Sequence, residues 1–477
     1  MNKSKVLGYA VGPVGSALLG FVSLPIITWF YSAEDVGRIA MLQVATSFCV
    51  LLFCLGLDQA YVREYHEEKD RPALLKNALL PGLLSLAISG FVVLFYDTEL
   101  LSRIMYAEPS TTFSLLTIGC FAAALISRFL SLILRMQEKA LAFSMSQLLP
   151  KLLFIIVISV GALMTIRASF YTLITVHAIS IVTAMLVFAW NTRSDWVLAA
   201  GRPLNKARLH HLLQFGLPLV VGGIASWGLN FMDKLFLRFL SGFTELGIYS
   251  VTTSIAAGIG VFSGIFTTIW APTVFKWAAE GISPEKIDEI SEHVAAAAFF
   301  IFVITGLLSW TLPYFLPDIY EPVQYLITAC IAAPLFYALS EAAAIGISIK
   351  RKTSYSMLAS VVAVSSNLVG NYMLVPTYGA AGAAASTALS FWIFLLCRTE
   401  LACVAWRRVP RFKLYSTTFL CLAIAVTVSL IQVEFRFFSA VVWFVAGCVG
   451  FSFYKRSIIV AKNELVALFQ KSGLRFD

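Results

Sequence analysis

Charged residues are scarce in this sequence. Asp, Glu, Lys and Arg together make up 13% of the 477 residues, whereas soluble proteins carry roughly a quarter. Apolar residues make up 59% of the chain, and the mean hydropathy is +0.84. Stretches long and polar enough for a separate water-soluble domain are absent too. These shortages exclude a soluble fold and predict an all-α polytopic membrane protein.

Cysteine pairs with CxxC spacing are also missing. All eight cysteines fall inside apolar runs, where cysteine behaves as a small hydrophobic residue. We therefore expect no disulfide framework, no metal site and no cofactor. The net charge of +9 comes from short basic clusters between the apolar runs, which is typical of loops on one side of a membrane and not of a nucleic-acid site.

Fourteen apolar runs have the length of about 20 residues that crosses a bilayer. Spans 1–6 and 7–12 are expected to form two six-helix lobes with a substrate site between them, and spans 13 and 14 an added pair. The corresponding domains are 1–200, 201–410 and 411–477, the last with a cytoplasmic tail. The runs lie near residues 6–30, 39–62, 75–96, 113–134, 141–164, 169–191, 212–239, 246–272, 294–316, 324–349, 354–375, 380–404, 414–432 and 437–454.

Basic residues cluster in every second connection between these spans, so most of them fall on one side of the membrane. One side holds most of the 35 Lys and Arg residues, and the other holds only Arg38, Arg103, Arg167 and Arg436. The positive-inside rule therefore predicts that both termini are cytoplasmic. The external connections are short, which argues against a membrane glycan polymerase or ligase with a large catalytic loop, so we expect that the protein is not an enzyme.

Lys151 is predicted to be the deepest charge. It lies about ten residues into its span, or about 15 Å from the cytoplasmic end, close to the membrane midplane. An ammonium group there costs roughly 2.5–3.5 kcal/mol on insertion scales. A buried carboxylate such as Glu341 would offset this cost by pairing, and so would a hydrated cavity that receives an anion. We favour the cavity and predict that Lys151 binds substrate.

Two arginines lie at similar depth nearer the cytoplasmic side. Arg128 is predicted to bind substrate, and Arg398 either binds substrate or extends its side chain to the interface. Glu341 follows Pro334 in a stretch of small and apolar residues, where a proton or cation site is expected. These assignments complete a cationic central site with one acidic coupling group.

A charged apolar run at residues 215–250 repeats a pattern found at residues 14–39, which indicates a weak internal duplication. Asp233 is a second candidate for ion coupling. Lys234 and Arg238 lie four residues apart on one helix face near the outer side. They are expected to line an external gate or exit rim, or to act as interfacial anchors.

Residues 366–390, SNLVGNYMLVPTYGAAGAAASTALS, carry an Asn, then Val-Pro, then a Gly-x-x-Gly-Ala-Ala pattern. Together with residues 56–65 and the Asp233 to Ser250 segment, this pattern resembles Wzx-type polysaccharide and O-antigen flippases of the multidrug/oligosaccharidyl-lipid/polysaccharide exporter superfamily. The resemblance extends over essentially the full length.

This resemblance implies a flippase that translocates an undecaprenyl-diphosphate-linked oligosaccharide across the bacterial inner membrane by alternating access, coupled to H⁺ or Na⁺. The implied partners are this lipid-linked substrate, membrane lipids and polysaccharide polymerase machinery. A lipid II flippase and a multidrug or cation antiporter of the same superfamily remain alternatives. The sequence leaves sugar specificity, coupling ion, resting conformation and oligomeric state open.

Overall fold

A computed structural model of the chain describes residues 3–164, 167–280, 285–432, 437–460 and 463. Within these ranges all regular structure is helical, which confirms the predicted all-α class. Twelve helices are long and apolar enough to cross a membrane, and α18 (Phe438–Phe453) is a shorter apolar helix. The chain is therefore a multi-pass membrane protein.

One of these twelve helices, α16 (Thr353–Ala405), contains two spans. Gly379 interrupts it with φ 50° and ψ −127°, a conformation that glycine adopts most readily because it has no Cβ. The two halves pack against each other: the hydroxyl of Ser386 donates to the Asn367 carbonyl at 3.1 Å, and the Asn367 amide donates to the Thr387 hydroxyl at 3.2 Å. The described residues thus contain fourteen apolar helical segments, as predicted.

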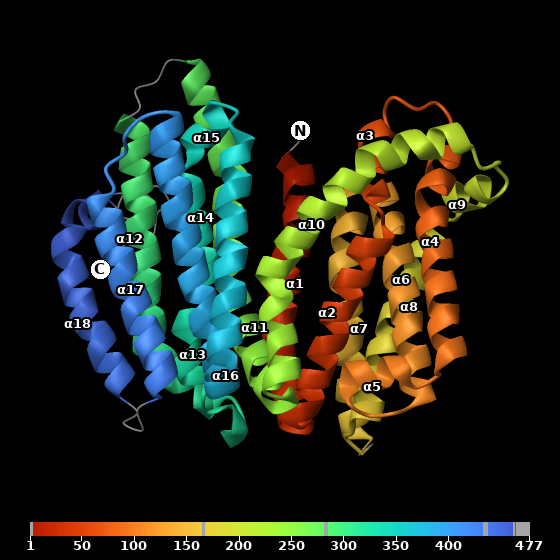
Figure 1. Cartoon of the computed structure of the whole chain (residues 1–477), viewed down its shortest axis with the longest axis horizontal. Helices are drawn as coiled ribbons and strands as arrows, with labels where there is room; N and C mark the ends of the chain where they lie inside the picture. Colours follow the sequence, from red (N-terminus) through yellow and green to blue (C-terminus); the bar gives the residue numbers. More distant parts are fainter. Residues whose placement is uncertain (1–2, 165–166, 281–284, 433–436, 461–462, 464–477) are drawn as a thin grey trace, which may run out of the picture. The chain divides into compact units, whose positions relative to one another are not determined.

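The chain divides into two compact units, Met1–Ser254 and Ile255–Asp477. In unit 1, α1 packs along α7, α6 packs between α4 and α8, and α10 packs on α2 and α3 (Figure 1). Its helices are α1 (Lys3–Phe30), α2 (Ala33–Phe53), α3 (Leu57–Glu64), α4 (Arg71–Tyr96), α5 (Leu100–Tyr106), α6 (Thr111–Met136), α7 (Ala140–Leu163), α8 (Phe170–Asn191), α9 (Arg193–Ala200), α10 (Lys206–Leu240) and the first turns of α11 (Phe243–Ala279).

The boundary between the compact units differs from the lobe boundary expected at 200/201. Helix α10 belongs to unit 1 because its backbone meets the start of α3 directly. A Cβ on Gly56 would lie 2.1 Å from the Gly216 carbonyl oxygen, and a Cβ on Gly216 would lie 2.7 Å from that of Leu55. Only glycines permit this approach. The six-helix lobes, defined by repetition and not by packing, stay a prediction.

The internal duplication brings its two copies into contact within unit 1. Gly37 near the start of α2 and Gly247 near the start of α11 occupy matching positions in the two repeated stretches. A Cβ on Gly37 would lie 2.0 Å from the Phe243 carbonyl oxygen, and a Cβ on Gly247 would lie 2.1 Å from that of Ala33. The contact is reciprocal, so the repeated pattern encodes a close crossing of two helix starts.

Unit 2 contains the predicted additional helix pair, α17 and α18. Helix α12 packs on α14 and α18, and α16 packs on α14 and α17. Trp443 of α18 is fully buried, and a Cβ on Gly306 of α12 would lie 2.1 Å from its ring. The pair is thus part of the unit 2 core. The helices are the rest of α11, α12 (Glu285–Leu308), α13 (Val323–Cys330), α14 (Ala332–Ala343), α15 (Ile345–Ile349), α16, α17 (Phe412–Ile431) and α18, with 3₁₀ turns at Ser309–Tyr314 and Asp318–Tyr320.

Basic residues form contacts at both ends of unit 1. Helices α3 and α9 mark one end and α5 the other (Figure 1). At the α3 end, Lys76 donates to the Ala200 carbonyl at 2.8 Å, and Arg208 pairs with Glu68 at 2.9 Å. The direction of the termini stays a prediction. Four basic residues used for that prediction lie outside the described residues: Arg436, Lys462, Lys471 and Arg475.

Candidate functional site: cationic cavities in unit 1

Lys151 lies near the middle of α7, where that helix packs along α1. Its ammonium donates a hydrogen bond to the backbone carbonyl of Ser16 at 2.9 Å. Gly20, one turn further along α1, leaves room for this contact, since a Cβ there would lie 3.6 Å from the ammonium nitrogen. The lysine therefore contacts a helix backbone, while Glu341 pairs with Arg398 within unit 2.

A cavity of about 290 Å³ lies against Lys151. Its walls come from α1, α2, α7, α8 and the start of α11, and among the described residues that line it Lys151 alone is charged. Hydroxyls and an amide add polar groups, from Ser23, Thr28, Gln43 and Ser250. An amphipathic pocket with one unneutralised cation favours an anionic ligand.

Arg128 lines a second cavity of about 600 Å³, between α2, α3, α6, α8 and α10. Its Nη2 and Nε atoms contact Oδ2 of Asp58 at 2.6 and 3.1 Å. The side chain of Asp58 is 11% exposed and that of Arg128 is 38% exposed. The arginine is thus both paired and accessible. The sequence placed Asp58 at the end of a span, and gave no indication that it pairs with Arg128.

The two cavities share three lining residues, Gln43, His177 and Ile181. His177 lies on α8, with its ring 5.6 Å from that of Phe154. Lys151 and Arg128 therefore border adjoining spaces inside one unit, as a common binding region requires. Sequence analysis gave no role to His177, because a single histidine in an apolar run carries no signal until its neighbours are known.

Arg398 and Glu341 form an ion pair in unit 2. The Nη1 atom of Arg398 contacts Oε1 of Glu341 at 2.5 Å and the Ser340 hydroxyl at 2.9 Å. The arginine side chain is 7% exposed and that of Glu341 is 22% exposed, with the ring of Phe394 at 5.3 Å. Arg398 does not extend to the interface, so that alternative is wrong. The pair joins α14 to the second half of α16.

Arg238 binds the last carbonyl groups of helix α5 in this structure. Its guanidinium donates to the carbonyls of Ile104 and Met105, at 3.1 and 3.4 Å, and lies 4.4 Å from the ring centre of Phe243. The last carbonyls of a helix have no intrahelical donor and carry partial negative charge. Arg238 therefore caps α5 and does not line either cavity of unit 1 described above.

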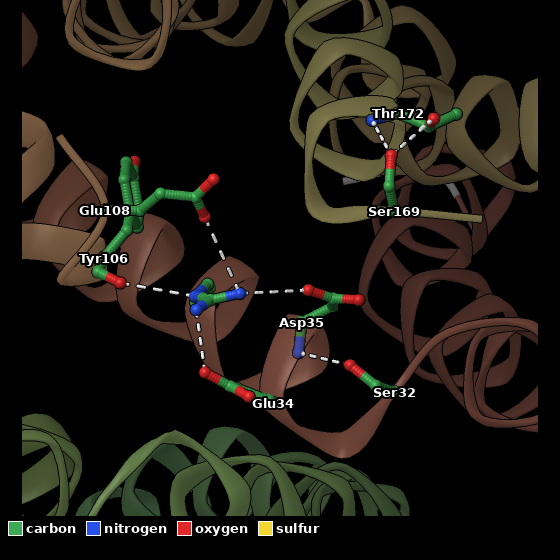
Figure 2. A network of polar contacts seen from close by, with 8 residues as sticks. Ser32, Glu34, Asp35, Tyr106, Glu108, Ser169 and Thr172 are labelled. Atoms are coloured by element: carbon green, nitrogen blue, oxygen red, sulfur yellow. Dashed lines mark hydrogen bonds and ion pairs between the residues drawn. The ribbon is translucent and has the colours of Figure 1, made fainter. Parts of the chain in front are cut away.

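Arg38 completes the cap of α5. Its Nε donates to the carbonyl of Tyr106 at 3.3 Å, and its Nη atoms contact the carboxylates of Glu34 at 2.7 Å and Asp35 at 3.3 Å (Figure 2). These acids lie in the first turn of α2, where negative charge is favourable. Two arginines, one from α2 and one from α10, thus hold α5 in place close to the contact between Gly37 and Gly247.

Asp233 and Lys234 lie on α10, one turn before Arg238. Asp233 is 3% exposed and accepts a hydrogen bond from the Tyr249 hydroxyl of α11 at 2.6 Å. Lys234 is half-buried beside it. The structure therefore brings Lys151 and Arg128 together, and leaves Lys234 and Arg238 near the α5 end. The binding and coupling roles of all these residues stay predictions.

Apolar membrane-spanning helices surround cavities with charged walls, which is the architecture of a polytopic membrane protein that can hold a ligand between its helices. The fold is similar to the solved structure of the lipid II flippase MurJ in an inward closed conformation, with a TM-score of 0.68 and 13% sequence identity over 98% of this chain and 100% of that one. It is also similar to an inward-facing multidrug resistance MATE family transporter of the MOP superfamily, with a TM-score of 0.58 and 14% identity over 81% of this chain and 94% of that one.

A MATE transporter in complex with MaL6 is similar too, with a TM-score of 0.53 and 13% identity over 89% of this chain and 97% of that one. Residues 3–277 match the family described as polysaccharide biosynthesis protein. The chain belongs to this family. Among curated proteins no sequence matches.

Proposed function

We propose that the protein is a flippase that moves an undecaprenyl-diphosphate-linked oligosaccharide, such as an O-antigen unit, across the bacterial inner membrane, with both termini cytoplasmic. Membership of the polysaccharide biosynthesis family and the transporter fold support this proposal. Polysaccharide polymerase machinery would receive the translocated unit.

The pair of adjoining cavities in unit 1 carries the proposal. Lys151 provides an ammonium that, among the described residues, contacts a carbonyl oxygen and no carboxylate at one cavity, and Arg128 provides an accessible guanidinium at the other. Guanidinium groups bind phosphate oxygens with fixed geometry, and ammonium groups act as point charges. A diphosphate headgroup presents several such oxygens, while hydroxyl groups on the cavity walls suit sugars.

A second candidate is the flipping of lipid II, favoured by the fold similarity to MurJ over 98% of this chain. Depletion of the protein in its source bacterium separates the two. The proposal predicts that an undecaprenyl-diphosphate oligosaccharide without a muropeptide accumulates in extracted lipids, as detected by mass spectrometry, while surface glycan is lost. Accumulation of lipid II would favour the second candidate, and accumulation of neither lipid would contradict both.

A multidrug or cation antiporter is supported by the fold similarity to MATE transporters. Such a function needs a cavity dominated by acidic groups. The charged residues that line the two unit 1 cavities are Lys151, Arg128 and Asp58, so basic groups outnumber acidic ones there. This balance favours an anionic substrate.

We propose ion coupling at Glu341, with Asp233 as the second candidate. Glu341 is partly exposed and faces the guanidinium of Arg398 and the phenol of Tyr337. Glu341→Gln removes the titrating group and keeps the shape, so transport in vesicles should lose part of its pH dependence while substrate binding persists. Asp233→Asn tests the second candidate in the same way. Unchanged pH and ionophore sensitivity in both variants would contradict this coupling.

A further inference from the structure

The contact between Asp58 and Arg128 uses only some of the hydrogen-bonding atoms of the carboxylate and the guanidinium. Both guanidinium contacts, from Nη2 and Nε, reach the same carboxylate oxygen Oδ2, and Gln59 donates to that oxygen as well at 3.1 Å. In the favourable fork geometry, two nitrogen atoms meet two oxygen atoms. The observed contact is therefore an incomplete match.

Arg128 has N–H donors left for a further hydrogen bond in the 600 Å³ cavity. Within the described part of the chain, its Nη1 has no hydrogen-bond acceptor, although the guanidinium has five N–H donors. More than a third of its side chain is exposed, whereas Asp58 is nearly buried. An anion that enters the 600 Å³ space thus reaches the arginine, whereas the carboxylate, which also lines this space, is less exposed.

We propose that Asp58 is a built-in counter-anion, which neutralises Arg128 in the empty cavity and is displaced from the guanidinium when a diphosphate headgroup binds. Two phosphate oxygens can meet two guanidinium nitrogens at once, which the observed carboxylate contact does not do. The displaced carboxylate keeps Gln59 as a donor. This inference deepens the proposed function and rests on it for the identity of the anion.

The exchange explains why the two cations differ in their surroundings. Lys151 contacts a neutral carbonyl and, within the part of the chain that the structure describes, has no carboxylate to displace, so it attracts any anion. Arg128 binds only a ligand that displaces Asp58 from its guanidinium. We therefore expect Arg128 and Asp58 to select diphosphate over weaker anions such as carboxylates.

The inference is tested by binding of inorganic pyrophosphate to the full chain in nanodiscs of neutral lipid. A site that is free for only a tenth of the time binds about tenfold more weakly than a free one. If Asp58 holds Arg128 this strongly, Asp58→Asn should tighten binding about tenfold. Arg128→Gln should weaken it, and the double variant should behave as Arg128→Gln does.

The double variant also guards against misfolding, because it leaves no unpaired charge in the cavity. Glu289→Gln is the control, since it removes the carboxylate of the exposed pair with Arg456 and should leave pyrophosphate affinity unchanged. Unchanged or weaker binding by Asp58→Asn would overturn the inference, and so would equal tightening by Glu289→Gln.

A proteoliposome assay with the lipid-linked oligosaccharide separates this inference from the proposed function. Translocation by the wild type without tighter pyrophosphate binding by Asp58→Asn would overturn the counter-anion alone. Tighter pyrophosphate binding without any translocation would uphold the exchange and contradict the flippase proposal.

Discussion

Two arginine–carboxylate pairs, one in each unit, have similar chemistry and different surroundings. Arg128 and Asp58 border a 600 Å³ cavity, and the arginine side chain is 38% exposed. Arg398 is 7% exposed and has a hydroxyl and an aromatic ring as further neighbours. The first pair is accessible to a ligand, and the second holds two helices together. Charge within a span therefore does not identify a binding residue until its exposure is known.

The largest effect on transport is expected at the cavity cation whose recorded contact is a carbonyl oxygen. Among the described residues Lys151 alone is charged in its cavity, so with Lys151→Ala the complementation of a depleted strain should fall at least tenfold in surface-glycan display, the equivalent of about 1.4 kcal/mol. The variant should still insert, because loss of a midplane charge does not disfavour insertion. Normal glycan display at equal protein level would remove Lys151 from the site.

The largest effect on stability is expected at Arg398, and Arg128 provides the comparison. Arg398→Leu leaves the partly buried carboxylate of Glu341 without its arginine partner and should lower the free energy of unfolding by about 3 kcal/mol, as measured by titration with a denaturing detergent. Arg128→Leu should lower it by less than half of that, because water screens the more exposed arginine and Asp58 keeps the Gln59 amide as a hydrogen-bond donor. Equal losses would show that both pairs are structural.

Arg238 tests whether a cation outside the two cavities also acts in transport. Arg238→Gln removes a charged donor from the last carbonyls of α5 and should lower stability by about 1 kcal/mol. Transport should change less than twofold after correction for protein level. A tenfold loss of transport in a stable variant would place Arg238 in the substrate path, as the sequence suggested.

The smallest effect is expected for an exposed pair of unit 2. Arg456 contacts Glu289 at 2.8 Å, with side chains 73% and 44% exposed. Exposed ion pairs contribute about 0–1 kcal/mol. Arg456→Ala should therefore leave both detergent stability and glycan display within error. A loss comparable to that of Arg398→Leu would mean that exposure does not separate the two kinds of charge.

The sequence predicted the helices better than the contacts between them. Hydropathy and short connections were sufficient for the fourteen segments, and Gly379 marked the turn that α16 makes. The depth expected for Lys151 rests on helix rise alone and stays a prediction. Such features depend on neighbouring residues, which a single sequence displays directly.

Pairings across helices were not predictable. Asp58 and Arg128 are 70 residues apart, and Glu341 and Arg398 are 57 apart. Several acids were compatible with each base, because depth in the membrane does not specify which helices are neighbours. The placement of α10 in unit 1 depended on a contact between two distant glycines, Gly56 and Gly216. The position of His177 between the two unit 1 cavities could likewise not be predicted, because it depends on how the helices pack.

The central claim is that Lys151 and Arg128 recognise the diphosphate of a lipid-linked oligosaccharide. Translocation of such a lipid into the outer leaflet of proteoliposomes, measured by its access to an added glycan-modifying enzyme, tests this claim most directly. The account predicts transport by the wild type, loss with Lys151→Gln or Arg128→Gln, and retention with Arg238→Gln. Wild-type transport that persists in both cavity variants would contradict it.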